Sequence, residues 1–147
     1  MLIKVIPQQI PQAWEIIKFA AVQADEIKAE HQQVYVNELL HALLSNKAQA
    51  WLRTDTDQKQ VKSVVITRLL GDQTTGEKYL LLQSFYAFEA HDNVEWAENM
   101  RLAIEFANKE GCSFISFNSK NSRILELATM FGFKERFIRL DYSLGGV

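Results

Sequence analysis

Residues 91–117 read HDNVEWAENMRLAIEFANKEGCSFISF, and this stretch decides which fold class the chain can adopt. Apolar side chains recur at helical spacing from Asn93 to Lys109, and Gly111 then marks the end of the helix. Residues 113–117 have the apolar and aromatic composition of a strand. A strand reached through a helix predicts a parallel pair with the strand before it, so the stretch predicts an α/β (α+β) fold. We expect the helix to turn these apolar residues toward the sheet: Val94, Ala97, Met100, Ile104 and Ala107.

The chain before this stretch predicts one strand, then two helices, then three more strands. Residues 2–6 predict a strand, and residues 13–24 and 36–44 predict two helices that cover a sheet. Three apolar and β-branched runs follow at residues 50–53, 63–70 and 79–88, separated by turn residues at 55–57 and 71–76. Their order predicts an antiparallel meander.

The chain after this stretch predicts one more helix and one more strand. Residues 121–131 predict a helix that ends at Gly132, and residues 133–144 predict a terminal strand. We therefore expect one domain over residues 1–147, with a mixed, mostly antiparallel sheet flanked by about four helices.

Composition excludes several classes of partner. The chain has 147 residues, 48% of them hydrophobic, and its 16 basic and 18 acidic residues give a formal charge of −2. This balance gives no electrostatic reason to expect nucleic acid or an anionic membrane. Cys112 is the only cysteine and forms no internal disulfide, and no apolar run approaches the roughly 20 residues of a membrane helix. We expect a cytoplasmic protein that does not bind membranes.

The last third of the chain carries a family resemblance. Residues 111–117 (GCSFISF), Asn121 at a helix start and residues 130–135 (MFGFKE) resemble the GNAT (Gcn5-related N-acetyltransferase) superfamily, as does the order of elements. The resemblance implies a GNAT-like fold with a parallel pair between strands four and five. It also implies acetyl-CoA as cofactor, bound through a glycine-rich turn between the fourth strand and the following helix.

The glycine-rich turn is absent from this chain. Alignment without gaps places His91 at the basic position, Asp92 and Val94 at two glycine positions, and Trp96 at the last small position. Bulky side chains therefore stand where backbone amides would approach a pyrophosphate.

The charges of the same segment also oppose an anion. Glu89, Asp92, Glu95 and Glu98 supply four carboxylates, and the segment contains no Lys or Arg. Asp92 and Glu95 have the spacing of a capping box, which occupies the amides that CoA would need. We predict that ordinary CoA binding is lost and expect no cofactor.

Catalytic residues are sparse under the same resemblance. The position of the usual tyrosine acid is Ala128. Glu89 is either a general base or a solvated charge at a strand end, and Tyr86 is either a substitute acid or a packed aromatic. If acyl-CoA does bind, the resemblance implies that its donor site comprises Ala87, Phe88, Asn93, Val94 and Glu95.

Metal and hydrolase chemistry find no support in the spacing of residues. His31, His41, His91 and Cys112 lack the short spacings of a zinc site, so we predict no metal. The serines near the end of the chain lie outside any nucleophile-elbow motif.

A concentration of positive charge near the end of the chain predicts docking or self-association. The basic residues are Lys120, Arg123, Lys134, Arg136 and Arg139, and their alternative role is outward alternation on a strand. We expect a protein partner to meet Trp96, Arg123, Arg136 and Arg139.

Two functions stay open, and the first is preferred. The first is a non-catalytic GNAT-like binding or assembly protein. Residues 119–125 and the terminal segment are similar to small phage-encoded proteins of this fold, which implies a virion or assembly factor. The alternative is an acyl-CoA-dependent N-acetyltransferase that acts on an amine through an atypical donor pocket.

Overall fold

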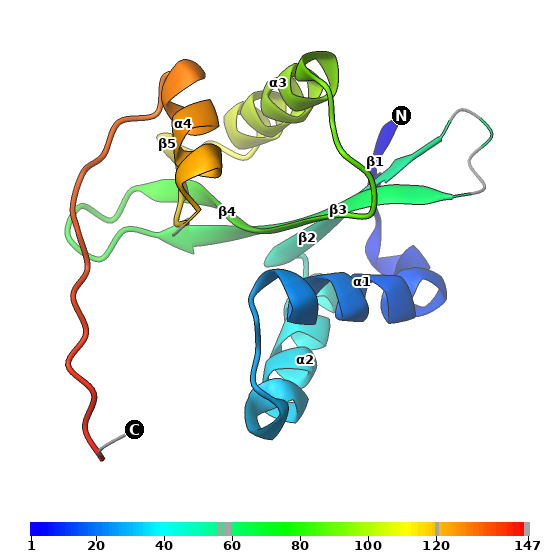
Figure 1. Ribbon diagram of the computed structural model, residues 1–147, viewed down its shortest axis with the longest axis horizontal. Helices are drawn as coiled ribbons and strands as arrows, with labels where there is room; N and C mark the ends of the chain where they lie inside the picture. The colour runs from blue at the N-terminus through cyan, green and yellow to red at the C-terminus, as the bar shows by residue number, and fades with distance from the viewer. Residues whose placement is uncertain (56, 58–59, 120, 146–147) are drawn as a thin grey trace.

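The fold alternates helices with the strands of a single sheet (Figure 1). The computed structural model describes residues 1–55, 57, 60–119 and 121–145. The strands are β1 Leu2–Val5, β2 Ala48–Thr54, β3 Val61–Gly71, β4 Lys78–Ala87 and β5 Phe114–Phe117. The helices are η1 Pro7–Gln9, α1 Ile10–Ala24, α2 Ala29–Leu44, α3 Asn93–Lys109 and α4 Ser122–Met130. Thr56 of the first predicted turn lies outside the described residues.

The sheet has the topology that the sequence predicted. Its order is β1-β2-β3-β4-β5, with antiparallel pairing from β1 to β4 and a parallel pair between β4 and β5. This mixed sheet with flanking helices is the GNAT-like α/β fold, as expected.

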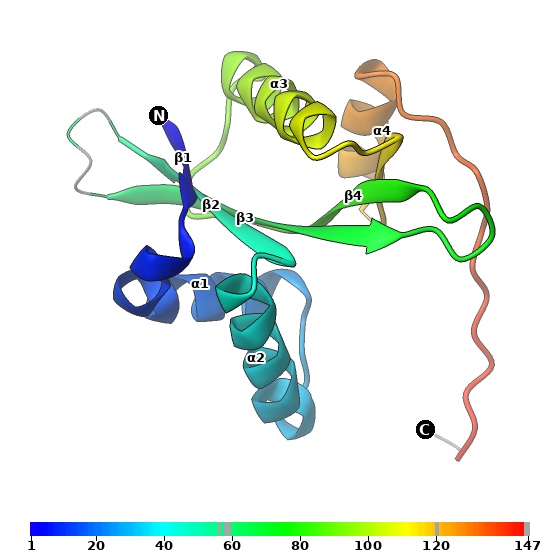
Figure 2. The same ribbon diagram turned by 180° about the vertical axis from the view of Figure 1, so that it is seen from behind.

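The two faces of the sheet are covered by different helices. Figures 1 and 2 show α1 and α2 on one face and α3 and α4 on the other. Ile17, Leu43 and Ile66 are fully buried on the first face, whereas Leu80 and Phe106 are buried on the second. Burial of each such side chain contributes about 1.5–3 kcal/mol.

β4 contains a bulge at the place where its pairing with β5 ends. Ile66 is opposite Ser84 but Thr67 is opposite Leu82, so Gln83 is the extra residue. The pairing of β4 with β5 ends where Leu82 meets Phe117. Beyond this point the two strands part, which leaves room for a cleft.

The predicted terminal strand is wrong. Residues 133–143 have no assigned helix or strand and residues 144–145 form a bend, and no strand pairing in the described part of the chain includes them. β5 has only four residues, so most of this segment runs past the end of the strand beside which it starts. Figure 1 shows it leaving the body as an arm, orange to red, beyond the β3–β4 hairpin.

The predicted face of α3 is also wrong in part. Val94 is 75% exposed and Ile104 is 43% exposed, whereas Phe106 and Ala107 are buried. The inward stripe includes Trp96, Asn99, Met100 and Ala103. The physical reason is a buried arginine of β2, described below, which draws a polar part of the helix toward the sheet.

Candidate functional site

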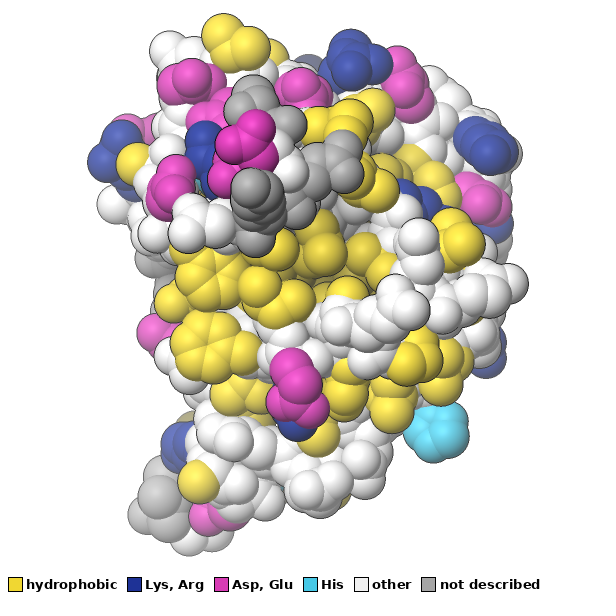
Figure 3. Space-filling model, turned by 90° about the vertical axis from the view of Figure 1, so that its right-hand side faces the viewer, with side chains coloured by type: hydrophobic (Ala, Val, Ile, Leu, Met, Phe, Trp, Pro, Cys, Tyr) yellow, Lys and Arg dark blue, Asp and Glu magenta, His cyan; other side chains and the backbone are white. Residues whose placement is uncertain are grey.

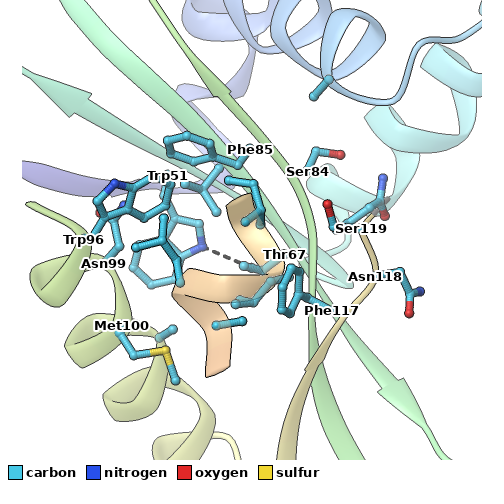
Figure 4. A pocket seen from close by; sticks show the side chains of 18 of the residues that line it. Trp51, Thr67, Ser84, Phe85, Trp96, Asn99, Met100, Phe117, Asn118 and Ser119 are labelled. Atoms are coloured by element: carbon cyan, nitrogen blue, oxygen red, sulfur yellow. Dashed lines mark hydrogen bonds between the residues drawn. The ribbon is translucent and has the colours of Figure 1, made fainter. Parts of the chain in front are cut away.

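A cleft of about 800 Å³ lies where β4 and β5 part. Figure 4 shows its walls, with α3 on one side, the end of β5 on the other and α4 behind. Asp25, after α1, reaches it from the opposite face of the sheet. Residues from β2 to α4 line the cleft, among them Trp51, Thr67, Leu82, Ser84, Phe85, Trp96, Asn99, Met100, Phe117, Asn118, Ser119, Ile124, Leu127 and Ala128.

Aromatic rings form the α3 side of this cleft. The Trp96 ring lies 4.7 Å from that of Phe85 and 5.7 Å from that of His91, measured between centroids. Trp51 lies deeper, 5.3 Å from Phe106. Trp96 and Phe117 therefore line the cleft without closing it (Figure 4).

Buried polar groups under the cleft are hydrogen-bonded in a chain. The Trp51 Nε1–H donates to Thr67 Oγ1 at 3.0 Å, drawn dashed in Figure 4, and Thr67 donates to Gln49 Oε1 at 2.8 Å. Gln49 in turn donates to the carbonyl of Asn46. Asn99 is different, because its buried Nδ2 has no acceptor in the part of the chain that the structure describes. The Nδ2 atom is itself buried, so a ligand reaches it only if the Asn99 side chain turns.

Asp25 is a carboxylate of the cleft lining with three hydrogen-bond donors. It accepts hydrogen bonds from Tyr35 Oη at 2.6 Å, from Ser84 Oγ at 2.8 Å and from Gln83 Nε2 at 3.4 Å. Burial, and then the bond to Asp25, raises the pKa of Tyr35 well above its ordinary value of 10.0. Tyr35 therefore stays protonated and holds the carboxylate in place.

The start of α3 has the capping box that the sequence predicted. Asp92 Oδ1 accepts from the amide of Glu95 at 2.8 Å, and the amide of Asp92 donates to Glu95 Oε1 at 3.2 Å. Each of the two residues thereby occupies the other's backbone amide. Val94, at a family glycine position, lies between them and is largely exposed.

The acidic start of α3 has basic neighbours from other strands, which the sequence did not predict. Arg53 of β2 is 3% exposed. It donates to Asn99 Oδ1 at 2.6 Å and to the carbonyl of Glu95 at 3.2 Å, and lies 3.2 Å from Glu98 Oε1. Lys62 of β3 donates to Glu95 Oε2 at 2.9 Å. This bond lowers the pKa of Glu95 and raises that of Lys62.

The predicted catalytic pair lies outside the cleft lining. The Glu89 carboxylate is 57% exposed and 3.9 Å from Lys62 Nζ. Tyr86 packs against Phe19 of α1, 5.7 Å away, and against Phe88. Ala87 and the residues at the α3 start are likewise absent from the walls, apart from Trp96.

The end of the molecule near β1 and the β2–β3 hairpin is apolar and hollowed (Figure 3). A shallow groove of about 240 Å³ lies there between β1, β2 and the start of α1. Its apolar walls include Ile3, Val5, Ala13 and Leu52. None of the described residues that line it is ionisable.

His91 and Cys112 occupy structural positions. The His91 ring nitrogens lie 2.9 Å from Ser63 Oγ and 3.1 Å from the carbonyl of Glu89. Cys112 is half-buried, and burial raises its pKa. Among the described residues, no three His, Cys, Asp or Glu side chains gather in a group that could hold a metal ion.

The predicted interaction residues do not form one patch. Trp96, expected to be exposed, is half-buried against Phe85. Arg123 lies in the first turn of α4, where its amide donates to Asn121 Oδ1. Arg136 and Arg139 lie on the arm, with the Arg136 guanidinium 5.4 Å from the Phe114 ring centre. Lys120 lies outside the described residues.

The sequence did not predict the cleft residues that come from distant parts of the chain. Asp25, Ser84, Asn99 and Trp51 come from four separate elements, and none belongs to a motif. The one local signal was the polar stretch after α1, which includes Asp25.

Fold and cleft together define the class: an α/β domain with the GNAT-like fold and an open cleft between β4 and β5. No protein-family model matches the sequence, and no curated protein matches it. The chain is similar in structure to a predicted acetyltransferase from Clostridium acetobutylicum solved with acetyl-CoA, with a TM-score of 0.74, 12% identity and coverage of 97% and 95% of the two chains.

Two further solved structures have the same fold. A ribosomal-protein-alanine N-acetyltransferase from Brucella melitensis gives a TM-score of 0.66 at 15% identity, with 99% of each chain covered. An aminoglycoside acetyltransferase from an uncultured soil metagenomic sample gives 0.71 at 12% identity, with 99% and 98% covered. Across the described ranges, no helix is both long and apolar enough to span a membrane.

Proposed function

We propose that this chain is a non-catalytic binding or assembly protein that keeps the GNAT-like fold without an acetyl-CoA pyrophosphate site. The proposal depends on one observation. At the start of α3, where a pyrophosphate would bind, side chains of the chain itself already accept hydrogen bonds from the backbone amides. Asp92 holds the amide of Glu95, and Glu95 holds the amide of Asp92. A phosphate would have to displace a cap worth about 1 kcal/mol and approach two carboxylates.

The nearby cations do not offset this cost. Arg53 and Lys62 lie beside the α3 start, but each is paired with a carboxylate of that helix. His91 is engaged through both ring nitrogens. A pyrophosphate would therefore have to displace the carboxylates that already pair with Arg53 and Lys62.

The test is isothermal titration with acetyl-CoA and free CoA at low salt, where phosphate attraction is strongest. We expect no binding up to millimolar ligand. Asp92→Ala with Glu95→Ala removes both side-chain acceptors of the cap, and this double variant should gain affinity for both ligands. Asp72→Asn is the matched control, since Asp72 caps an exposed turn far along the sheet. Micromolar binding by the unaltered protein would overturn the proposal.

A second candidate function is an acyl-CoA-dependent N-acetyltransferase with an atypical donor pocket. The open cleft favours it, because its volume of about 800 Å³ leaves space for a ligand between β4 and β5. Asp25 lines the cleft and could receive a proton from an amine.

This candidate is tested by the release of CoA thiol from acetyl-CoA in the presence of a panel of primary amines and polyamines. Activity that Asp25→Asn removes and Glu89→Gln leaves unchanged would establish Asp25 as the base. If Glu89→Gln removes the activity and Asp25→Asn does not, Glu89 is the general base, as the resemblance implied. The absence of thiol release with every amine would leave the binding function.

A further inference from the structure

The cleft between β4 and β5 is lined from both faces of the sheet, and its two ends differ in chemistry. Ser84 and Phe85 are consecutive in β4, so their side chains point to opposite faces, as Figure 4 shows. On the face that α1 and α2 cover, Ser84 Oγ donates to Asp25 Oδ1 at 2.8 Å. On the face that α3 covers, the Phe85 ring centre lies 4.7 Å from that of Trp96. All four residues line the same cleft.

The end of the cleft on the α3 side is apolar. Its lining combines side chains of the sheet with those of α3 and α4: Trp51, Leu82, Trp96, Met100, Ile124 and Leu127. The cleft volume of about 800 Å³ is that of a site for a small organic molecule. An apolar group is favoured at this end, because its burial removes apolar surface from water.

The other end holds the Asp25 carboxylate between neutral donors. Tyr35 Oη, Ser84 Oγ and Gln83 Nε2 each donate a hydrogen bond to it. Tyr35 belongs to α2 and the other two donors belong to β4, so the carboxylate is fixed from two elements. Hydroxyl and amide donors fix the position of the carboxylate without cancelling its charge.

The charges around this end favour a cation. Among the described residues that line the cleft, the ionisable side chains are Asp25 and Glu26, and both are acidic. Arg68 approaches from outside the lining, where it donates to the amide oxygen of Gln83. Its guanidinium is already paired with the Glu38 carboxylate at 2.6 Å. An anionic group at this end would therefore meet like charge, whereas a cationic group would meet opposite charge.

We propose that the cleft binds one organic cation with an apolar body, with its charged head at Asp25 and its body on the α3 and α4 side. Three of the about four lone-pair sites of the Asp25 carboxylate already accept hydrogen bonds, so a quaternary or tertiary ammonium head fits better than a primary amine. A quaternary nitrogen has no lone pair to accept an acetyl group, so such a ligand is bound without chemical change. The inference rests on the proposed binding function and names the class of ligand for it.

The experiment is isothermal titration with octyltrimethylammonium at low salt, where attraction between charges is strongest. Octanoate is the first matched ligand, because it joins a similar apolar chain to an anionic head. Tetramethylammonium is the second, because it has the cationic head without the apolar body. We expect one site for octyltrimethylammonium and at least about tenfold weaker binding of each matched ligand. Equal affinity for either matched ligand, or no binding of octyltrimethylammonium up to millimolar concentration, would overturn the inference.

Substitutions at the two ends of the cleft test the placement of the ligand. Asp25→Asn keeps an oxygen acceptor but removes the charge, and should weaken octyltrimethylammonium binding about tenfold. Trp96→Ala removes part of the apolar wall, leaves Asp25 in place and should also weaken binding about tenfold. Glu15→Gln is the matched control, since it removes one carboxylate from α1 where the Glu15 side chain is 86% exposed and paired with Lys18.

The control should bind octyltrimethylammonium as the unaltered protein does. Unchanged affinity in Asp25→Asn or in Trp96→Ala, with circular dichroism showing the variant folded, contradicts the proposed placement. An equal loss in Glu15→Gln contradicts it as well. Acetyl-CoA binding would overturn the proposed function, whereas a failure of both acetyl-CoA and octyltrimethylammonium to bind would overturn this inference alone.

Discussion

Arg53→Met is expected to destabilise the domain more than any substitution of a surface charge. Arg53 is buried under α3, where it holds Asn99 Oδ1, the carbonyl of Glu95 and the carboxylate of Glu98. Methionine fills similar volume but donates no hydrogen bond. The substitution therefore isolates the polar link between β2 and α3.

The expected loss of stability follows from the polar groups of α3 that lose their partner when Arg53 is replaced. Each hydrogen bond from a charged donor contributes about 1.5–3 kcal/mol net, and removing one partner of a buried pair costs about 3–5 kcal/mol. The Glu98 side chain is 33% exposed and can turn to water, which reduces the loss. We expect the free energy of unfolding to fall by about 3 kcal/mol, and the melting temperature by roughly 6–12 °C.

Urea unfolding followed by tryptophan fluorescence measures this loss. Arg101→Met is the matched control, because Arg101 and Glu105 form an exposed pair on the same helix, with side chains 60% and 59% exposed. The control should change stability by about 0.5 kcal/mol or less. A loss below about 1 kcal/mol for Arg53→Met, or equal losses in both variants, would refute the structural role of Arg53.

Three other substitutions have defined expected outcomes. Thr67→Val removes the acceptor of the Trp51 indole and should cost about 1–3 kcal/mol by chemical denaturation, with Thr67→Ser close to the unaltered protein. Lys62 lowers the pKa of Glu95, so this stabilisation is present above the unfolded pKa and lost as pH falls through the folded one. Urea midpoints should therefore fall below about pH 4.5, and Glu95→Gln should flatten that fall; an unchanged profile would contradict the ion pair. Asn121→Ala removes the cap of α4 and should cost about 1 kcal/mol in a thermal melt, whereas Asn121→Asp should not.

Local sequence patterns predicted the elements whose ends carry strong signals. α3 runs from Asn93 to Lys109, as predicted, because Asp92 caps its start and Gly111 follows its end. The parallel pair of β4 and β5 followed from the helix between them. The capping box was also predictable, since its two residues are three apart.

Patterns failed where a contact joins distant residues. The inward face of α3 was misplaced because Arg53, more than forty residues earlier, draws Asn99 toward the sheet. The terminal strand was predicted from alternation alone. An alternating segment becomes a strand only when a neighbouring edge is long enough to pair with it, and β5 is too short.

The sequence alone determined the order of elements, the absence of a glycine-rich turn before α3 and the capped start of α3, since each depends on residues close in the chain. Only the tertiary structure decided that Arg53 and Lys62 neutralise the acidic helix start and that Asp25 faces the cleft. It also decided that residues 133–143 join no strand of the sheet in the described part of the chain. These outcomes depend on which distant surfaces meet, and the distance between two side chains in space is not encoded in their spacing along the chain.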